Sequence, residues 1–269
     1  MTISQLKNFA ARIRRQTLEM ITRAGAGHIG SNFSIVDILT VLYNNALKTD
    51  SKHPQWPLRD RFILSKGHAC ASLYAILAEK DFFPKSWLDK FYLEGGLLAG
   101  HATHTVPGVE VSTGALGHGL PIACGMALCA KLDRKKWRVF CLISDGELDE
   151  GSVWEALLFA PHHKLDNLTL IIDYNKIQAL GNTNEVLNLE PLQKKLTAFN
   201  WKVREIDGHN FNEIKQTLTS VPFKDDSPSC IIANTIKGKG VSFMENKLEW
   251  HYRCPDETEL SKAIQELEI

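Results

Sequence analysis

Two residues stand where a polar side chain directly follows an apolar run, and both are suited to bind a hard cation. Asp145 follows the apolar run 137–143, and Asn175 follows the apolar run 168–172, thirty residues further along the chain. A carboxylate, an amide oxygen and a nearby backbone carbonyl are ligands of the kind that magnesium takes, with its other positions left to water and phosphates. Spacing alone leaves a second interpretation open, in which Asp145 caps a helix that begins near Ser152 and Asn175 fills a turn.

The two apolar runs are expected to be neighbouring parallel strands. Both are apolar throughout, and a predicted helix from Ser152 to about His163 lies between them. A single crossover helix returns the chain to the same edge of a sheet, so the two strands end side by side. Ligands of open parallel sheets bind beyond the carboxyl ends of the strands, which places Asp145 and Asn175 at the expected site.

The alternation of strands and helices extends along the chain and predicts the fold class. Uniformly apolar strands that alternate with helices indicate an α/β fold, with a mostly parallel sheet and helices on both faces. No repeat, low-complexity tract or linker divides the sequence, so we expect residues 1–269 to form one domain. Further strands are expected at 61–64, 201–206 and 230–233, and further helices up to about Arg23, from Ser34 to about Leu47 with a capping box at Asp37, at 70–80 and at 211–218.

Three segments match motifs of other functions, and their context argues against each. The GxGxxG at 25–30 follows residues with helical spacing, whereas a dinucleotide fingerprint needs a preceding strand. The segment 237–240 follows a strand but lacks the spacing of a phosphate-binding loop. Residues 111–130 carry no formal charge over a membrane-spanning length, but they contain four glycines and a proline. We expect a glycine loop followed by a buried helix there.

Composition indicates a soluble globular protein of the cytoplasm. The 31 basic and 31 acidic residues balance, which argues against binding to nucleic acid or to an anionic membrane. The six cysteines form no CxxC pair, so we expect reduced and mostly buried thiols. Charged residues such as Lys7 and Arg12 interrupt the first apolar positions, so no signal peptide is expected. The glycine-rich segment 94–119 is expected to be a long functional loop.

Several motifs taken together resemble transketolase, a thiamine diphosphate-dependent enzyme. Asp145-Gly146-Glu147 followed by Asn175 resembles the thiamine diphosphate signature. The resemblance covers nearly the whole chain but only the amino-terminal half of transketolase, which binds the diphosphate and the metal. The chain therefore resembles the small subunit of a split transketolase. The blocks that narrow the resemblance are GHIG at 27–30, DRFILSKGHA at 60–69, GH at 100–101, PGVEVSTGALGHG at 107–119, EGSVWEA at 150–156, KGKGVSFM at 237–244 and WH at 250–251.

The resemblance implies two cofactors, thiamine diphosphate and Mg²⁺, and a role for individual residues. The magnesium ligands would be Asp145, Asn175 and the Ile177 carbonyl. Ser144 stands where the family usually has a glycine, and because serine is small we expect cofactor binding to be retained. The residues that would contact the cofactor are His68, Gly114, Leu116, Asp145, Gly146, Glu147, Asn175 and His251. The residues that would be catalytic are His28, His68, His101, Glu150 and His251.

The histidines suit the implied reaction because ketol transfer requires proton transfer at sugar hydroxyls near neutral pH. His118 would contact the cofactor only indirectly. Glu150 and Glu155 match acidic residues that link two active sites across a subunit interface, although a helix amino terminus also favours negative charge. We expect the remaining histidines to be structural or surface residues, namely His104, His162, His163 and His209.

The implied activity is the transfer of a two-carbon ketol group from a ketose phosphate to an aldose phosphate. The partner would be a separate pyrimidine-binding subunit in an α2β2 heterotetramer, with segments 95–109 and 111–130 as candidate interface surfaces. Two alternatives remain, namely the α-type subunit of a 2-oxo acid dehydrogenase and a non-catalytic binding module with a relic cofactor site. The set of histidines and Trp250-His251 favour transketolase over the dehydrogenase subunit. The presence of Asp145, Asn175 and all four histidines argues against the relic site. The sequence does not indicate which sugars react.

Overall fold

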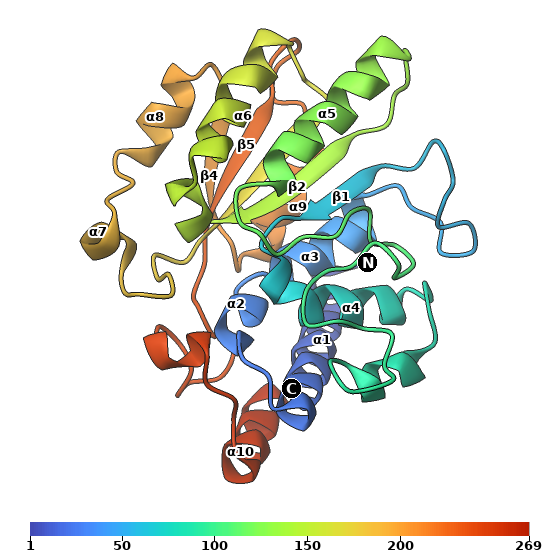
Figure 1. The fold of residues 1–269 in the computed structure, drawn as a ribbon, viewed down its shortest axis with the longest axis vertical. Coiled ribbons are helices and arrows are strands. Elements are labelled where there is room, and N and C mark those ends of the chain that lie inside the picture. Colours follow the sequence, from blue (N-terminus) through green and yellow to red (C-terminus); the bar gives the residue numbers. More distant parts are fainter. Residues whose placement is uncertain (269) are drawn as a thin grey trace.

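A five-stranded parallel sheet forms the centre of the computed structural model, which describes residues 1–268 (Figure 1). The strand order is β1-β2-β3-β5-β4, and every neighbouring pair is parallel. The predicted α/β class is therefore confirmed. The strands are β1 (Arg61–Leu64), β2 (Val139–Ser144), β3 (Leu168–Tyr174), β4 (Lys202–Asp207) and β5 (Ser229–Asn234).

Helices cover both faces of the sheet, as Figure 1 shows. Successive side chains of a strand point to opposite faces. Phe140 and Leu142 of β2 accordingly join one apolar core, while Val139, Cys141 and Ile143 join the other. One core includes α1 (Ile3–Ala24), α3 (Val36–Val41), α4 (Cys70–Glu79), α9 (Phe211–Thr219) and α10 (Glu257–Leu267). The other includes α5 (Gly119–Leu132), α6 (Gly151–His162) and α8 (Leu192–Ala198).

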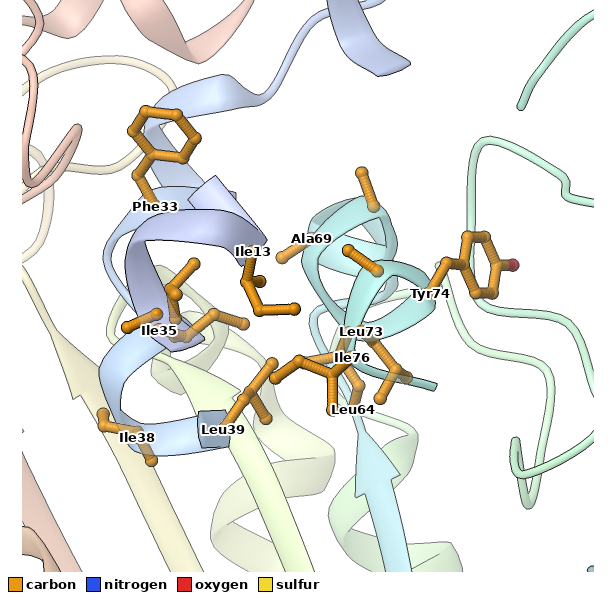
Figure 2. Packing of buried hydrophobic residues seen from close by; sticks show 14 of the residues in the cluster. Ile13, Phe33, Ile35, Ile38, Leu39, Leu64, Ala69, Leu73, Tyr74 and Ile76 are labelled. Atoms are coloured by element: carbon orange, nitrogen blue, oxygen red, sulfur yellow. The ribbon is translucent and has the colours of Figure 1, made fainter. Parts of the chain in front are cut away.

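The first helix has its boundaries encoded locally. Thr2 caps α1 and forms a capping box with Gln5, and Gly25 ends the helix in the left-handed conformation with φ of 60°. Figure 2 shows the interior that results, in which Ile13 of α1, Leu39 of α3 and Ile76 of α4 belong to one apolar cluster. These helices hold the loops at the carboxyl edge of β1.

The predicted helix from Ser34 to Leu47 is wrong at its start. A short helix, α2 (Ile29–Phe33), precedes Ser34, and a π-helical turn (Leu42–Ala46) follows α3. The Ser34 hydroxyl donates to Asp173 of β3 at 2.7 Å instead of capping a helix with Asp37. A buried carboxylate is a stronger acceptor than a local backbone group, so the tertiary contact determines the orientation of this side chain.

The remaining segments agree with the sequence analysis in part. Within residues 1–268 no helix combines the length and apolarity needed to cross a membrane, and 119–132 forms α5 as a half-buried helix. Residues 91–118 contain neither helix nor strand, as expected of a long loop. The six cysteines are free; Cys129 is exposed and Cys254 half-buried, while the other four are buried as predicted. The sequence analysis missed α7 (Thr183–Val186), α8 and α10.

Candidate functional site

The carboxyl ends of four strands converge on one cavity of about 200 Å³. His68 follows β1, Asp145 follows β2, Asn175 follows β3 and Lys237 follows β5. A second hollow of about 200 Å³ adjoins it and shares three histidines with it. The main cavity is lined by His28, Ser31, His68, His101, Gly114, Leu116, Ser144, Asp145, Gly146, Asn175, Ile177, Gln178, Ala179, Lys237, His251 and Tyr252.

Asp145 and the segment after β3 lie in direct contact, as the parallel sheet required. The Asp145 carboxylate accepts hydrogen bonds from Gly146 N at 2.8 Å and from Lys176 N at 2.5 Å. Its first bond caps the short 3-10 turn Gly146–Asp149. Helix α6 begins only at Gly151 and has no side-chain cap, so the alternative in which Asp145 caps α6 is wrong.

The electrostatic surroundings of Asp145 favour a bound cation. Burial and the nearby Asp173 raise the pKa of Asp145 to about 6, although two backbone donors and Lys237 act in the opposite direction. A positive charge bound next to such a buried carboxylate stabilises its ionised form. One cationic group already reaches this place, since Lys237 Nζ donates to the Ile177 carbonyl at 2.8 Å.

The donor set fits magnesium and not a transition metal. Asp145 offers a carboxylate, Asn175 an amide oxygen and Ile177 a carbonyl, and all three residues line the cavity. Among residues 1–268 no group of three or more His, Cys, Asp or Glu side chains is arranged to hold a metal ion. A site with one carboxylate leaves coordination positions for water and phosphate oxygens, which is how magnesium binds.

Two glycines beside these donors pack closely against the cavity wall. A Cβ on Gly146 would come within 2.9 Å of the Gln178 Cβ. Gly114 has φ of 155°, and a Cβ there would meet the His101 ring at 3.0 Å. Both glycines therefore let the backbone pack against side chains of the cavity wall more closely than a Cβ would allow.

Four histidines that are far apart in the sequence meet at this cavity. The ring centroid of His28 lies 4.9 Å from that of His68, 6.4 Å from that of His101 and 5.3 Å from that of His251. The backbone holds two of them together, because His28 N donates to His251 O at 2.8 Å. Asn32 joins a third, with its Nδ2 donating to the carbonyls of His28 and His68.

Three of these imidazoles are neutral at pH 7. Burial and the positive groups around it lower the pKa of His28 to about 4, and burial followed by Lys237 lowers that of His251 to about 3. Burial also holds the pKa of His68 well below its usual range. Lys237 Nζ donates to His251 Nδ1 at 2.8 Å, so the proton of neutral His251 resides on Nε2. His251 can therefore donate a hydrogen bond from Nε2.

Acidification is expected to destabilise the wild-type chain more than a His28→Asn variant. Unfolded His28 binds a proton below pH 6.5, whereas folded His28 stays neutral down to about pH 4. Its contribution to the free energy of unfolding is present above pH 6.5 and is lost as the pH falls toward 4. Urea unfolding at pH 7.5, 6, 5 and 4.5 measures the difference. Equal pH dependence in the two proteins would contradict the low pKa.

Glu147 supports the site from behind instead of lining the cavity. Its side chain is fully buried and accepts hydrogen bonds from the Ser65 hydroxyl and from Gly117 N. Ser65 Oγ in turn accepts from Gly119 N at 3.0 Å. We expected the Glu147 side chain to contact the cofactor directly. Its carboxylate instead accepts hydrogen bonds that hold the glycine loop, and it does not line the cavity.

Two glutamates and three further histidines that the sequence analysis considered lie outside the cavity. Glu150 and Glu155 are exposed at the start of α6, and Glu155 borders an apolar hollow between α5 and α6. Exposed His118 does not line the cavity, and His104 Nδ1 lies 2.9 Å from Ser112 Oγ outside it. His209 is structural, with bonds to Asp37 and to the backbone.

Sequence reasoning missed two lysines that organise the site. Lys66 is fully buried, and its Nζ donates to Asp173 at 2.6 Å and to the Ser31 carbonyl at 2.7 Å. Asp173 also accepts from Asn175 Nδ2 at 3.0 Å, which orients the amide oxygen. Lys237 bridges Ile177 and His251. The available signal was position, because each lysine closely follows a buried strand.

Comparison with known protein families matches residues 5–267 to the family described as "Transketolase, thiamine diphosphate binding domain". The chain belongs to the transketolase family. It is 39% identical over 267 residues to an apulose-4-phosphate transketolase subunit of Phocaeicola vulgatus, covering 99% of this chain and 95% of that one. It is 44% identical over 264 residues to "6-deoxy-6-sulfo-D-fructose transketolase subunit SqwG" of a Clostridium species, covering 98% and 96%.

A solved transketolase has the same fold over the whole of this chain. The crystal structure of transketolase from Campylobacter jejuni superimposes with a TM-score of 0.94 and 34% identity. The match covers 99% of this chain and 43% of the Campylobacter chain, so this protein spans less than half the length of that transketolase. The resemblance to the amino-terminal part of transketolase is confirmed, and the 2-oxo acid dehydrogenase alternative is not supported.

Proposed function

We propose that this chain is the diphosphate- and metal-binding subunit of a two-chain transketolase. With a pyrimidine-binding partner it would transfer a two-carbon ketol group from a ketose phosphate to an aldose phosphate. The observation that carries the proposal is the meeting of Asp145, Asn175 and the Ile177 carbonyl with four histidines in one cavity. Two relatives named as transketolase subunits, which match along nearly their full length, support the division into two chains.

The metal and diphosphate would be held at the ends of β2 and β3. Asp145, Asn175 and Ile177 supply oxygen ligands for Mg²⁺, and the cavity lined by Gly114 and Gly146 leaves room for the diphosphate. Lys237 is the cationic side chain that lines the same cavity, and it would add a positive charge beside the phosphates. Thiamine diphosphate would supply the carbon nucleophile that accepts the ketol group.

The histidines would handle the substrate's hydroxyl protons. His28 is neutral at pH 7, so it can accept a proton from a hydroxyl and return it later. His251 would begin as a donor from Nε2, because Lys237 occupies its Nδ1. The relatives' names refer to an apulose phosphate and to a sulfofructose. We assign this chain sugar phosphates as a class and no individual sugar.

Thiamine diphosphate titration in the presence of Mg²⁺ tests the first half of the proposal. Asp145→Asn keeps the side-chain shape but removes the buried negative charge. Loss of an outer-shell partner of a metal site costs about 10–100-fold in affinity, so loss of the negative charge of a direct ligand should cost about 100-fold. Calorimetry with and without Mg²⁺ measures this. The fold should persist, since a carboxyl with a pKa raised to about 6 does not contribute favourable charge burial.

Asp225→Asn is the matched control, because Asp225 is exposed and does not line the cavity. It should bind the cofactor as the wild type does. Equal affinity of the Asp145 variant and the wild type would remove Asp145 from the site. Failure of the wild type, with its partner present, to bind thiamine diphosphate would favour the non-catalytic binding module.

A further inference from the structure

Two side chains outside the cavity form hydrogen bonds with the backbone of the turn that carries Lys237. Ile236 N donates to His209 Nε2 at 2.8 Å, and Arg14 Nε donates to the Lys239 carbonyl at 2.9 Å. One of these hydrogen bonds is made just before Lys237 in the sequence, and the other just after it. Arg14 belongs to α1 and His209 to the loop after β4, so neither is close to Lys237 in the sequence.

One buried carboxylate contacts both of these side chains. Asp37 of α3 accepts from both terminal nitrogens of Arg14, at 2.8 Å each, and its Oδ2 lies 2.8 Å from His209 Nδ1. The three side chains are 9%, 5% and 11% exposed for Arg14, Asp37 and His209. Burial by itself would raise the pKa of Asp37, but Arg14 and His209 hold it lower, at about 2.

The hydrogen-bond directions fix the state of His209. A backbone amide can only donate, so Nε2 accepts a hydrogen bond from the Ile236 amide and carries no proton itself. Nδ1 therefore carries the proton and donates it to Asp37. His209 is a neutral link with a defined tautomer between a fixed carboxylate and the backbone of the turn.

We propose that Arg14, Asp37 and His209 are positioning residues that hold the Lys237 turn in register with the cofactor site. In this structure Lys237 Nζ lies 2.8 Å from both the Ile177 carbonyl and His251 Nδ1, so the position of the turn decides where this positive charge stands in the cavity. A displacement of the turn would change the distances from Lys237 Nζ to these two acceptors. The arrangement makes diphosphate affinity depend on hydrogen bonds to the turn from outside the cavity. This last step rests on the proposed function.

Two isosteric variants of His209 separate positioning from simple packing. Asparagine places its amide nitrogen near the position of Nδ1, so His209→Asn keeps the bond to Asp37 and loses the acceptor for Ile236. Glutamine places its amide oxygen near the position of Nε2, so His209→Gln keeps that acceptor. Asp37 itself is unsuitable for substitution, because its loss leaves the buried Arg14 guanidinium unpaired.

The test has one readout without ligand and one with it. Hydrogen exchange of the Ile236 amide in the chain alone should be faster in His209→Asn and close to wild type in His209→Gln. The dissociation constant for thiamine diphosphate with Mg²⁺, measured with the partner subunit present, should rise about 10–100-fold in His209→Asn and change little in His209→Gln. Melting temperatures show whether both variants fold.

Each outcome decides a different claim. Equal cofactor affinity of the two folded variants would overturn the positioning role while leaving the proposed function intact. Equal exchange rates at Ile236 would overturn it as well. If the wild type binds no thiamine diphosphate but the exchange rates differ as expected, the proposed function is wrong. The role of His209 in holding the Ile236 amide would still be supported.

Discussion

Purified alone, this chain should show no ketol transfer above background, and activity should appear when the pyrimidine-binding subunit is added. Among the described residues that line the cavity and the adjoining hollow, Lys237 is the one lysine or arginine, and it is already bonded to Ile177 and His251. A sugar phosphate needs cationic or multiple donor groups for its phosphate. We expect the partner to supply them.

The surface of the chain offers a place for that partner. Ile122 of α5 and Leu158 and Phe159 of α6 are 38%, 63% and 37% exposed, and an apolar hollow lies between the two helices. Exposed apolar area of this kind marks interaction sites, and obligate interfaces exceed about 2,000 Å². The segment 111–130 contributes here, since α5 is buried on one side and exposed on the other.

The experiment compares the chain alone, the partner alone and the mixture. Ketol transfer is assayed in each, and the mass in solution is measured by light scattering, with an α2β2 heterotetramer expected for the mixture. Leu158→Glu should weaken assembly, because a charge would enter the contact. Leu132→Glu, at the exposed end of α5, is the matched control. Full activity of the lone chain would refute the two-chain proposal.

His101→Ala and His251→Ala, assayed with the partner, should lower turnover far more than cofactor affinity. Both residues line the cavity, and His251 has a defined donor at Nε2. A positioned proton-transfer group contributes on the order of 10²–10⁴-fold, so kcat should fall by that factor. The dissociation constant for thiamine diphosphate should change by less than about tenfold, because the metal and diphosphate donors remain.

His104→Ala is the matched control for this pair. His104 lies in the same long loop as His101 and is likewise exposed, but it does not line the cavity. Its variant should keep the wild-type rate. Rates near wild type in both the His101 and the His251 variants would make these histidines structural and leave proton transfer to other groups.

The location of the candidate site was predictable from the sequence because periodicity and strand order are local properties. The apolar runs before Asp145 and Asn175 had to become buried parallel strands, and a crossover helix had to return the chain to the same edge. The hydrogen bond from Lys176 N to Asp145 confirms that the two segments meet. The resemblance added the four histidines, whose spatial grouping no spacing rule would have given.

Partner choice among buried polar groups was decided only by the tertiary structure. Ser34 was expected to cap a helix and instead donates to Asp173, and Glu147 was expected at the cofactor and instead holds Gly117. Arg14 reaches Lys239 across 225 positions of sequence. A hydrogen bond requires two atoms within about 3 Å and in line, and only the packing of helices against the sheet brings such distant groups to that distance. The sequence determined which strand ends carry polar residues, whereas the packing determined which of those residues face the cavity and which hold its walls.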